Sequence, residues 1–177
     1  MQNVAFKEWS LVCDALGRGE QSIILRKGGI AEGRAGFSFQ HDEFFLFPTF
    51  FHEQVECVRV RPTEIPTSAD TITLRSYAKI EAAERVTSLA VAEALAPLHI
   101  VSADVVRERF HYEGDGLQVA FVRIFALSDP WSFPDEKRFG GCRSWIDLPT
   151  PPSRELRAVL RDEENVSRRD LFRATLG

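Results

Sequence analysis

Residues 117–127 read LQVAFVRIFAL, an apolar run in which Arg123 is the only charged residue. A continuous run of β-branched and aromatic residues of this length is typical of a buried strand. Asp129 and Pro130 follow the run, and the residue before a proline favours extended or turn backbone, so we expect the strand to end there. The run predicts the central strand of a β-sheet.

Shorter apolar runs predict three further strands. Their ranges are 21–27 (QSIILRK), 44–47 (FFLF) and 71–80 (TITLRSYAKI). Two glycines stop the first run, Pro48 stops the second, and the third alternates between apolar and polar residues in the manner of a half-buried strand. A proline-rich connector over residues 59–70 leads into the third strand.

Helical spacing of apolar residues predicts the helices of the chain. Their ranges are 6–16, 88–96, 102–110 and 154–160. Ser102 and Ser153 are the expected N-caps of the last two, because a serine hydroxyl accepts a hydrogen bond from an amide of the first turn. Residues 165–177 are expected to fold back or to fray.

These elements predict an α+β fold with a curled mixed β-sheet or a small β-barrel and flanking helices. Strands and helices do not alternate regularly enough for a doubly wound parallel fold. We expect a single α+β domain over residues 1–150, followed by a C-terminal helical tail over residues 151–177.

The composition is that of a protein with one hydrophobic core. Of the 177 residues, 44% are hydrophobic and 27% are charged, which suits one domain. The net charge of -4 argues against a protein that coats nucleic acid by bulk charge, although it leaves a local basic groove open. The three cysteines are widely spaced and indicate reduced thiols. Without an apolar stretch of about 18 residues or a signal-peptide core, we expect a cytoplasmic protein with no membrane partner.

The first candidate site follows the strand predicted at residues 21–27. Arg26 and Lys27 leave this strand just before Gly28 and Gly29, which permit a ligand to approach the backbone closely. Arginine offers a planar fork for phosphate or a base edge, and lysine offers a point charge. The four residues predict a phosphate or nucleotide site. The alternative, that the two cations only solvate a strand end, stays open.

The second cluster is FFLFPTFFHEQ, residues 44–54, in which most phenylalanines are expected in the core. His52 is a candidate general base with Glu53 as its orienter, and His52 and Gln54 are candidate ligand contacts. No second histidine completes a His-Glu-x-x-His pattern, so we predict no metal site.

The third cluster is FGGCRSWIDL, residues 139–148. Trp145 is a candidate platform on which a base stacks, and Arg143 is a candidate phosphate contact. The alternative is that Trp145 seals one end of a barrel while Arg143 faces water. Cys142 has no histidine near it in sequence, so a nucleophilic role is not expected.

Three segments together resemble a bacterial family known as domain of unknown function 1802. They are AFKEWSLVCDALGRGEQSIILRKGGIAEG (5–33), FLFPTFFHEQ (45–54) and GGCRSWIDL (140–148). The resemblance extends over residues 5–148 and implies no activity by itself. Some members of the family occur with a restriction-endonuclease-like region, which implies a restriction-modification or nucleic-acid setting.

A second resemblance is to the ASCH group of the PUA-like superfamily. Its Gly-x-Lys-x-x-Glu-x-Arg signature falls here on Gly19, Gln21, Ile24 and Arg26, so the glycine and the arginine are kept while the lysine and the glutamate are replaced. The resemblance implies a PUA-like β-barrel that holds RNA or a modified base in a cleft.

The leading hypothesis is a cofactor-free binding module for RNA, DNA or a modified nucleotide. Arg26 and Lys27 would contact phosphate, and Phe50, Trp131 or Trp145 would supply an aromatic wall. One alternative is a small metal-dependent nuclease or nucleotide hydrolase that uses the histidine–glutamate pair of the second cluster. Another is an accessory subunit that binds proteins, for which a large exposed aromatic patch would be the mark.

Overall fold

Two long antiparallel strands form the centre of the sheet. The computed structural model describes residues 1–27, 37–60 and 70–177, apart from the side chain of His52. β4 (Thr71–Val86) pairs with β5 (Leu117–Pro134) along its whole length. The strand predicted at residues 117–127 is therefore central, as expected.

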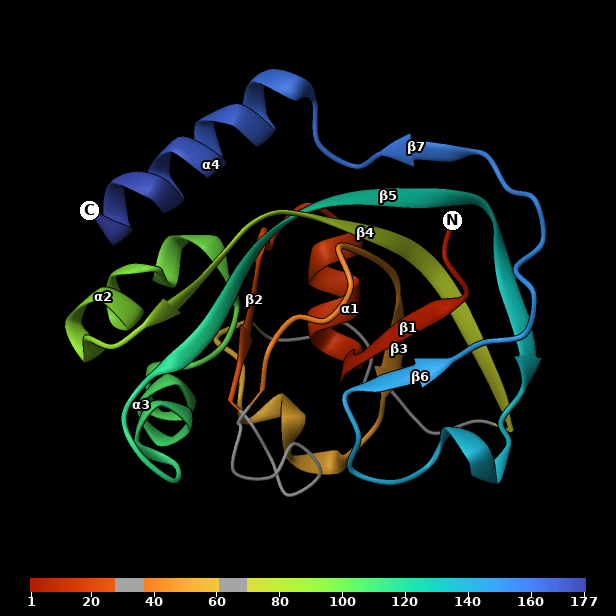
Figure 1. The fold of residues 1–177 in the computed structure, drawn as a ribbon, viewed down its shortest axis with the longest axis horizontal. Helices are drawn as coiled ribbons and strands as arrows, with labels where there is room; N and C mark the ends of the chain where they lie inside the picture. Colours follow the sequence, from red (N-terminus) through yellow and green to blue (C-terminus); the bar gives the residue numbers. More distant parts are fainter. Residues whose placement is uncertain (28–36, 61–69) are drawn as a thin grey trace.

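The expected end of this strand at Asp129 and Pro130 is wrong. The pairing steps from Leu74 opposite Trp131 to Ser76 opposite Ala126, so residues 127–130 of β5 bulge out of the ladder. A proline is tolerated in a bulge because no ladder hydrogen bond needs its missing amide. β5 therefore bends at this point and continues to its end at Pro134 (Figure 1).

Seven strands of the described residues form one mixed sheet in the order β2-β5-β4-β3-β1-β6, with β7 beside β5. β1 runs parallel to β3 and antiparallel to β6, and the other pairs are antiparallel. The shorter strands are β1 (Val4–Trp9), β2 (Ile23–Arg26), β3 (Glu43–Thr49), β6 (Trp145–Asp147) and β7 (Leu156–Ala158). The sheet curls around α1 (Ser10–Gly17) without closing, and this confirms the predicted α+β fold with a curled mixed sheet (Figure 1).

The remaining helices flank the sheet. The α-helices are α2 (Leu89–Ala94), α3 (Ala103–His111) and α4 (Asp162–Leu176), and the 3-10 turns are η2 (His52–Val55), η3 (Ala96–Leu98) and η4 (Lys137–Phe139). The Ser102 hydroxyl accepts a hydrogen bond from the amide of Val105 at 3.4 Å, which confirms the predicted N-cap of α3. No helix in the described ranges has the length and apolar character needed to span a membrane.

Two sequence predictions of helices are wrong. The helix expected over residues 6–16 begins only at Ser10, because the preceding residues pair as β1 with strands on both sides. The helix expected over residues 154–160 contains β7 instead, which pairs with the bent part of β5. Of the two alternatives expected for residues 165–177, the structure shows folding back: most of them belong to α4, and Phe172 is buried against the ring of Phe121.

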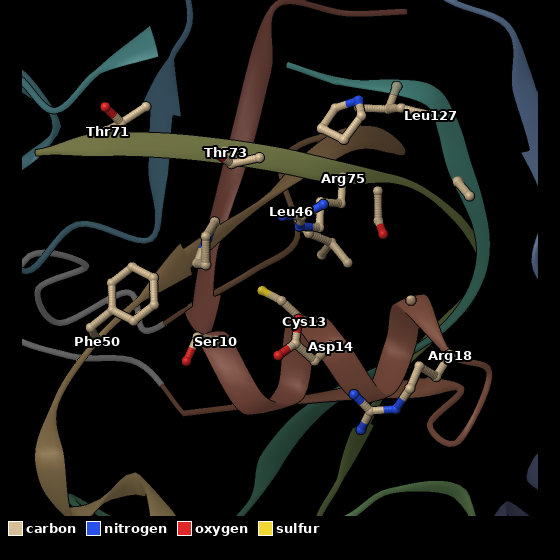
Figure 2. Close-up of a pocket in the computed structure, with 15 residues that line it drawn as sticks. Ser10, Cys13, Asp14, Arg18, Leu46, Phe50, Thr71, Thr73, Arg75 and Leu127 are labelled. Atoms are coloured by element: carbon tan, nitrogen blue, oxygen red, sulfur yellow. The ribbon is translucent and has the colours of Figure 1, made fainter. Parts of the chain in front are cut away.

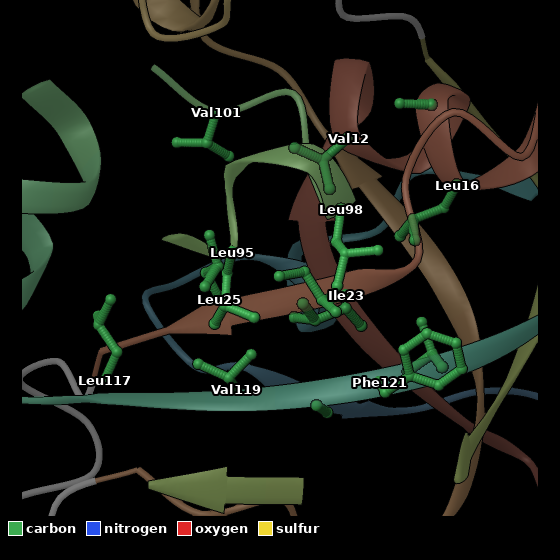
Figure 3. Close-up of a cluster of buried hydrophobic side chains, with 14 of the residues drawn as sticks. Val12, Leu16, Ile23, Leu25, Leu95, Leu98, Val101, Leu117, Val119 and Phe121 are labelled. Carbon is green, nitrogen blue, oxygen red and sulfur yellow. The ribbon is translucent and has the colours of Figure 1, made fainter. Parts of the chain in front are cut away.

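The larger buried cluster lies between α1, β2, β5 and the α2–α3 region (Figure 3). Ile23 and Ile24 of β2 are fully buried in it, which explains the apolar run in that strand. Burial of each such side chain contributes about 1.5–3 kcal/mol of transfer free energy. This cluster fixes the end of β2, where Arg26 lies, relative to β1.

Candidate functional site

Residues 6–10 are the last four residues of β1 and the first residue of α1. They contact all three sequence clusters, and we call them the β1 junction. The backbone amide of Lys7 donates to the carbonyl of Ser144 over 2.9 Å, in the third cluster. The hydroxyl of Ser10 donates to Oε1 of Gln54 over 3.0 Å, in the second cluster. Clusters that lie far apart in sequence therefore meet along one short segment.

Arg26, from the first cluster, places its guanidinium at the β1 junction. Its Cζ lies 5.3 Å from the centroid of the Phe6 ring, and its Nη2 donates to the Ser144 hydroxyl over 2.9 Å. Its Nε is buried and has no hydrogen-bond acceptor among the described residues. Packing of a guanidinium on an aromatic ring stabilises it by about 0.5–2 kcal/mol. The N–H groups in the plane of the guanidinium can still donate to an anion. Arg26 is thus held in place, and within the described part of the chain one of its donors has no acceptor.

Trp145 begins β6 and packs against the same phenylalanine. The centroid of its ring lies 4.9 Å from that of Phe6, 5.0 Å from that of Phe44 and 4.9 Å from that of His41. Its Nε1 is buried and, within the described ranges, has no acceptor. Buried N–H groups in proteins are nearly always paired, and two such donors at one place complement a ligand rich in acceptors.

Two further charged residues at the β1 junction were not predicted from the sequence. Glu8 is only 1% exposed, and its Oε1 accepts a hydrogen bond from the amide of Trp9 over 2.7 Å. Arg109 of α3 places its Cζ 4.2 Å from the centroid of the Trp9 ring and donates from Nη1 to the carbonyl of Leu25 over 3.0 Å. Burial lowers the pKa of Arg109, Glu8 raises it and Arg26 lowers it, so the three charges interact.

Lys27 points away from Arg26 and is occupied elsewhere. Its ammonium donates to the carbonyls of Phe110 over 3.2 Å and Gly116 over 2.8 Å, and also to that of Gly114. Burial lowers its pKa, and the nearby charge of Arg85 lowers it further. The structure thus uses Lys27 to hold the turn between α3 and β5.

Gln54 is fully buried and holds the first turn of α1. Its Oε1 accepts hydrogen bonds from the Ser10 hydroxyl and, over 3.2 Å, from the amide of Leu11, while its Nε2 donates to the carbonyl of Phe51 over 3.0 Å. Amides in the first turn of a helix have no intrahelical acceptor, so this side chain supplies one. A ligand contact by Gln54 stays a prediction.

The other predicted residues are dispersed. Arg143 is exposed, and its charge adds to burial in lowering the pKa of Lys7, so the two cations are close. Glu53 is exposed in the 3-10 turn η2 (His52–Val55). Trp131 is half-buried and packs on Phe45 at the edge of the second buried cluster, which lies on the other side of the sheet strands and includes Ala5, Phe45, Leu74, Leu127 and Ile146. Three predictions lie outside the described part of the chain: Gly28, Gly29 and the side chain of His52.

The described residues contain no group of three or more histidine, cysteine, aspartate or glutamate side chains placed to hold a metal ion. The polar groups at the β1 junction are mainly cations and N–H donors, which complement an anion.

Solved structures of an ASCH protein have a similar fold. ASCH from Zymomonas mobilis matches with a TM-score of 0.50 and 12% identity, over 94% of this chain and 92% of that one. The S128A mutant of the same protein matches with a TM-score of 0.45 and 14% identity, over 97% of this chain and 99% of that one. At such identities the likeness is one of fold, and it agrees with the expected PUA-like architecture.

No curated protein matches the chain. The family model described as "Domain of unknown function (DUF1802)" matches residues 5–170. This match includes the β1 junction and all three sequence clusters, and it covers nearly the whole chain. The protein therefore belongs to the DUF1802 family.

Proposed function

We propose that this protein is a binding module of PUA-like type for nucleic acid or a nucleotide, with its contacts centred on Arg26 and Trp145. One observation carries the proposal: Nε of Arg26 and Nε1 of Trp145 are buried donors without an acceptor in the described structure, and both side chains pack on Phe6. Phosphate oxygens and base carbonyls are acceptors of the kind that these donors require.

The local charge supports an anionic ligand, although the chain as a whole is negative. Glu8 is the buried carboxylate of the β1 junction, and Asp135 lies close enough to raise the pKa of Lys7. Four cations lie at or beside the junction: Lys7, Arg26, Arg109 and Arg143. A local excess of positive charge attracts phosphate independently of the net charge.

The fold and the family resemblance support the same proposal. The ASCH resemblance implies a cleft that holds RNA or a modified base. Trp145 is an aromatic side chain at the β1 junction on which such a base can stack. The family resemblance also implies a restriction-modification setting. That setting requires DNA as the ligand, so it applies to the DNA form of the proposal.

Fluorescence polarisation tests the proposal with short single-stranded, duplex and modified-base oligonucleotides at two salt concentrations. Arg26→Ala is expected to weaken binding by about 1–3 kcal/mol and to flatten its salt dependence, because one phosphate contact is lost. Arg161→Ala is the matched control, since Arg161 is exposed just before α4. Absence of binding to every probe, or full binding by a folded Arg26→Ala protein, would overturn the proposal.

A further inference from the structure

A second cleft, of about 470 Å³, lies between α1 and the curled sheet and shares Ser10 with the β1 junction (Figure 2). It is lined by one face of α1, by the end of β3 and by the bulged parts of β4 and β5. Its volume falls within the range of about 300–1,000 Å³ that is typical of small-molecule sites. Neither Arg26 nor Trp145 lines it.

One face of α1 forms a wall of the cleft. Ser10, Cys13, Asp14 and Gly17 follow the spacing of one helix face and line the cleft, whereas the other face of α1 is buried in the core. A Cβ atom on Gly17 would lie 3.1 Å from the Ser76 hydroxyl, so the helix approaches β4 closely at this end.

The bulge between β4 and β5 supplies an arginine to the opposite wall. Arg75 is the single residue of β4 that lies opposite residues 127–130 of β5. A bulge redirects the side chain at the interruption and is frequent beside binding sites. Arg75 is exposed, lines the cleft and makes no hydrogen bond or ion pair with any described residue. Its guanidinium is therefore available to a ligand.

The aromatic wall of the cleft is Phe50, just after β3. Its ring is half-buried, belongs to neither of the two buried clusters and has no ring partner among the described residues. In Figure 2 Phe50 lies at one end of the cleft and Arg18 at the other, with Arg75 between them. The ring is placed to stack on a planar group and contributes little to the core.

Of the two arginines that line the cleft, Arg18 makes hydrogen bonds within the described part of the chain and Arg75 makes none. Arg18 is engaged by Glu20 through two hydrogen bonds of 2.9 Å. Burial raises the pKa of the Asp14 carboxyl, while Arg18 and Arg75 lower it, so both guanidinium groups lie near this carboxylate. A nucleophilic role for the cleft is disfavoured because burial raises the pKa of the Cys13 thiol, which donates to the carbonyl of Glu8 over 3.7 Å.

We propose that this cleft binds a nucleoside monophosphate, with the base against Phe50 and the phosphate on Arg75. An aromatic ring and a free guanidinium in one cleft match the two halves of such a ligand. The proposal is independent of the function assigned to the β1 junction.

Isothermal titration calorimetry tests it with the four ribonucleoside 5′-monophosphates, the matching nucleosides and inorganic phosphate. At least one monophosphate is expected to bind more tightly than its nucleoside and more tightly than phosphate. Arg75→Ala is expected to weaken monophosphate binding by about tenfold or more and to leave nucleoside binding unchanged. Phe50→Ala is expected to weaken nucleoside and monophosphate binding alike, by about tenfold. Arg85→Ala, an exposed arginine elsewhere on β4, is the control.

The result that overturns the proposal is no saturable binding of any monophosphate at millimolar concentration. Monophosphate binding that survives both Arg75→Ala and Phe50→Ala but is lost in Arg26→Ala would also overturn it, because the ligand would then occupy the β1 junction. Weaker monophosphate binding in both Arg75→Ala and Phe50→Ala, together with unchanged oligonucleotide binding by the two variants, supports two different sites. If oligonucleotides do not bind while monophosphates still depend on Arg75, this proposal stands and the proposed function falls.

Discussion

Nη2 of Arg26 donates a hydrogen bond to the hydroxyl of Ser144 over 2.9 Å, between residues 118 positions apart in the chain. This contact joins the first sequence cluster to the third. It orients the guanidinium over Phe6 and leaves Nε without an acceptor in the described structure. The proposed function depends on this orientation.

Ser144→Ala is expected to weaken oligonucleotide binding less than Arg26→Ala does. The substitution removes one hydrogen bond that positions the arginine but leaves its charge, so stability should fall by about 0.5–1.5 kcal/mol. Polarisation titrations and urea unfolding measure the two effects. Binding by Ser144→Ala as weak as that of Arg26→Ala would show that the hydroxyl itself contacts the ligand.

Lys27→Met is expected to destabilise the protein and to spare binding. Its ammonium makes three hydrogen bonds to carbonyls at the end of α3 and in the turn that follows, so their loss should cost about 1–3 kcal/mol. Urea unfolding gives the stability, and polarisation gives the affinity of the folded fraction. Unchanged stability with lost binding would instead support the phosphate contact expected from the sequence.

Gln54→Ala is expected to lower the unfolding free energy by about 1–3 kcal/mol, because it leaves the buried Ser10 hydroxyl and the Leu11 amide without their acceptor. Glu53→Ala is a matched control at an exposed neighbouring position and should change stability by less than about 0.5 kcal/mol. Equal stability of the two variants, measured by urea unfolding, would contradict a capping role for Gln54.

His99 is expected to make stability depend on pH. Burial is the main cause that lowers its pKa to about 4 from 6.5, followed by the charges of Arg59 and Arg109. At a pH between these two pKa values, the His99 side chain binds a proton in the unfolded chain but not in the folded protein. The unfolding free energy should therefore fall as the pH drops from 6.5 to 4, by up to about 3 kcal/mol.

NMR titration of the His99 imidazole checks this pKa. Urea unfolding at pH 7 and pH 5 checks the stability. A His99 titration midpoint near 6.5 would contradict the burial argument.

The sequence predicts those strands that are long, continuous and apolar, as residues 117–127 show. It does not predict β1, because Phe6 and Trp9 fit the apolar face of a helix as well as a strand. Pairing with β3 and β6, which lie much later in the chain, decides between the two. β6 and β7 have three residues each, which is too short for a periodic pattern.

The candidate site was predictable in part. Arginine and tryptophan in separate glycine-flanked segments predicted Arg26 and Trp145, and the fold brings both to Phe6. Arg26 contacts Ser144, whereas Lys27 contacts carbonyls at the end of α3 and in the turn that follows, and adjacency in sequence does not reveal this difference. Glu8 and Arg109 carry no local signal, since only tertiary packing buries them.

The measurement that tests the central claim most directly is a ¹H–¹⁵N spectrum of the tryptophan indoles during titration with the oligonucleotide that binds most tightly. The chain has three tryptophans, and Trp145→Phe assigns the relevant signal. The indole N–H of Trp145 is expected to shift to saturation as it gains an acceptor, while that of Trp131, packed in the second buried cluster, stays unchanged. A Trp145 signal that keeps its free position with the oligonucleotide fully bound would contradict the claim.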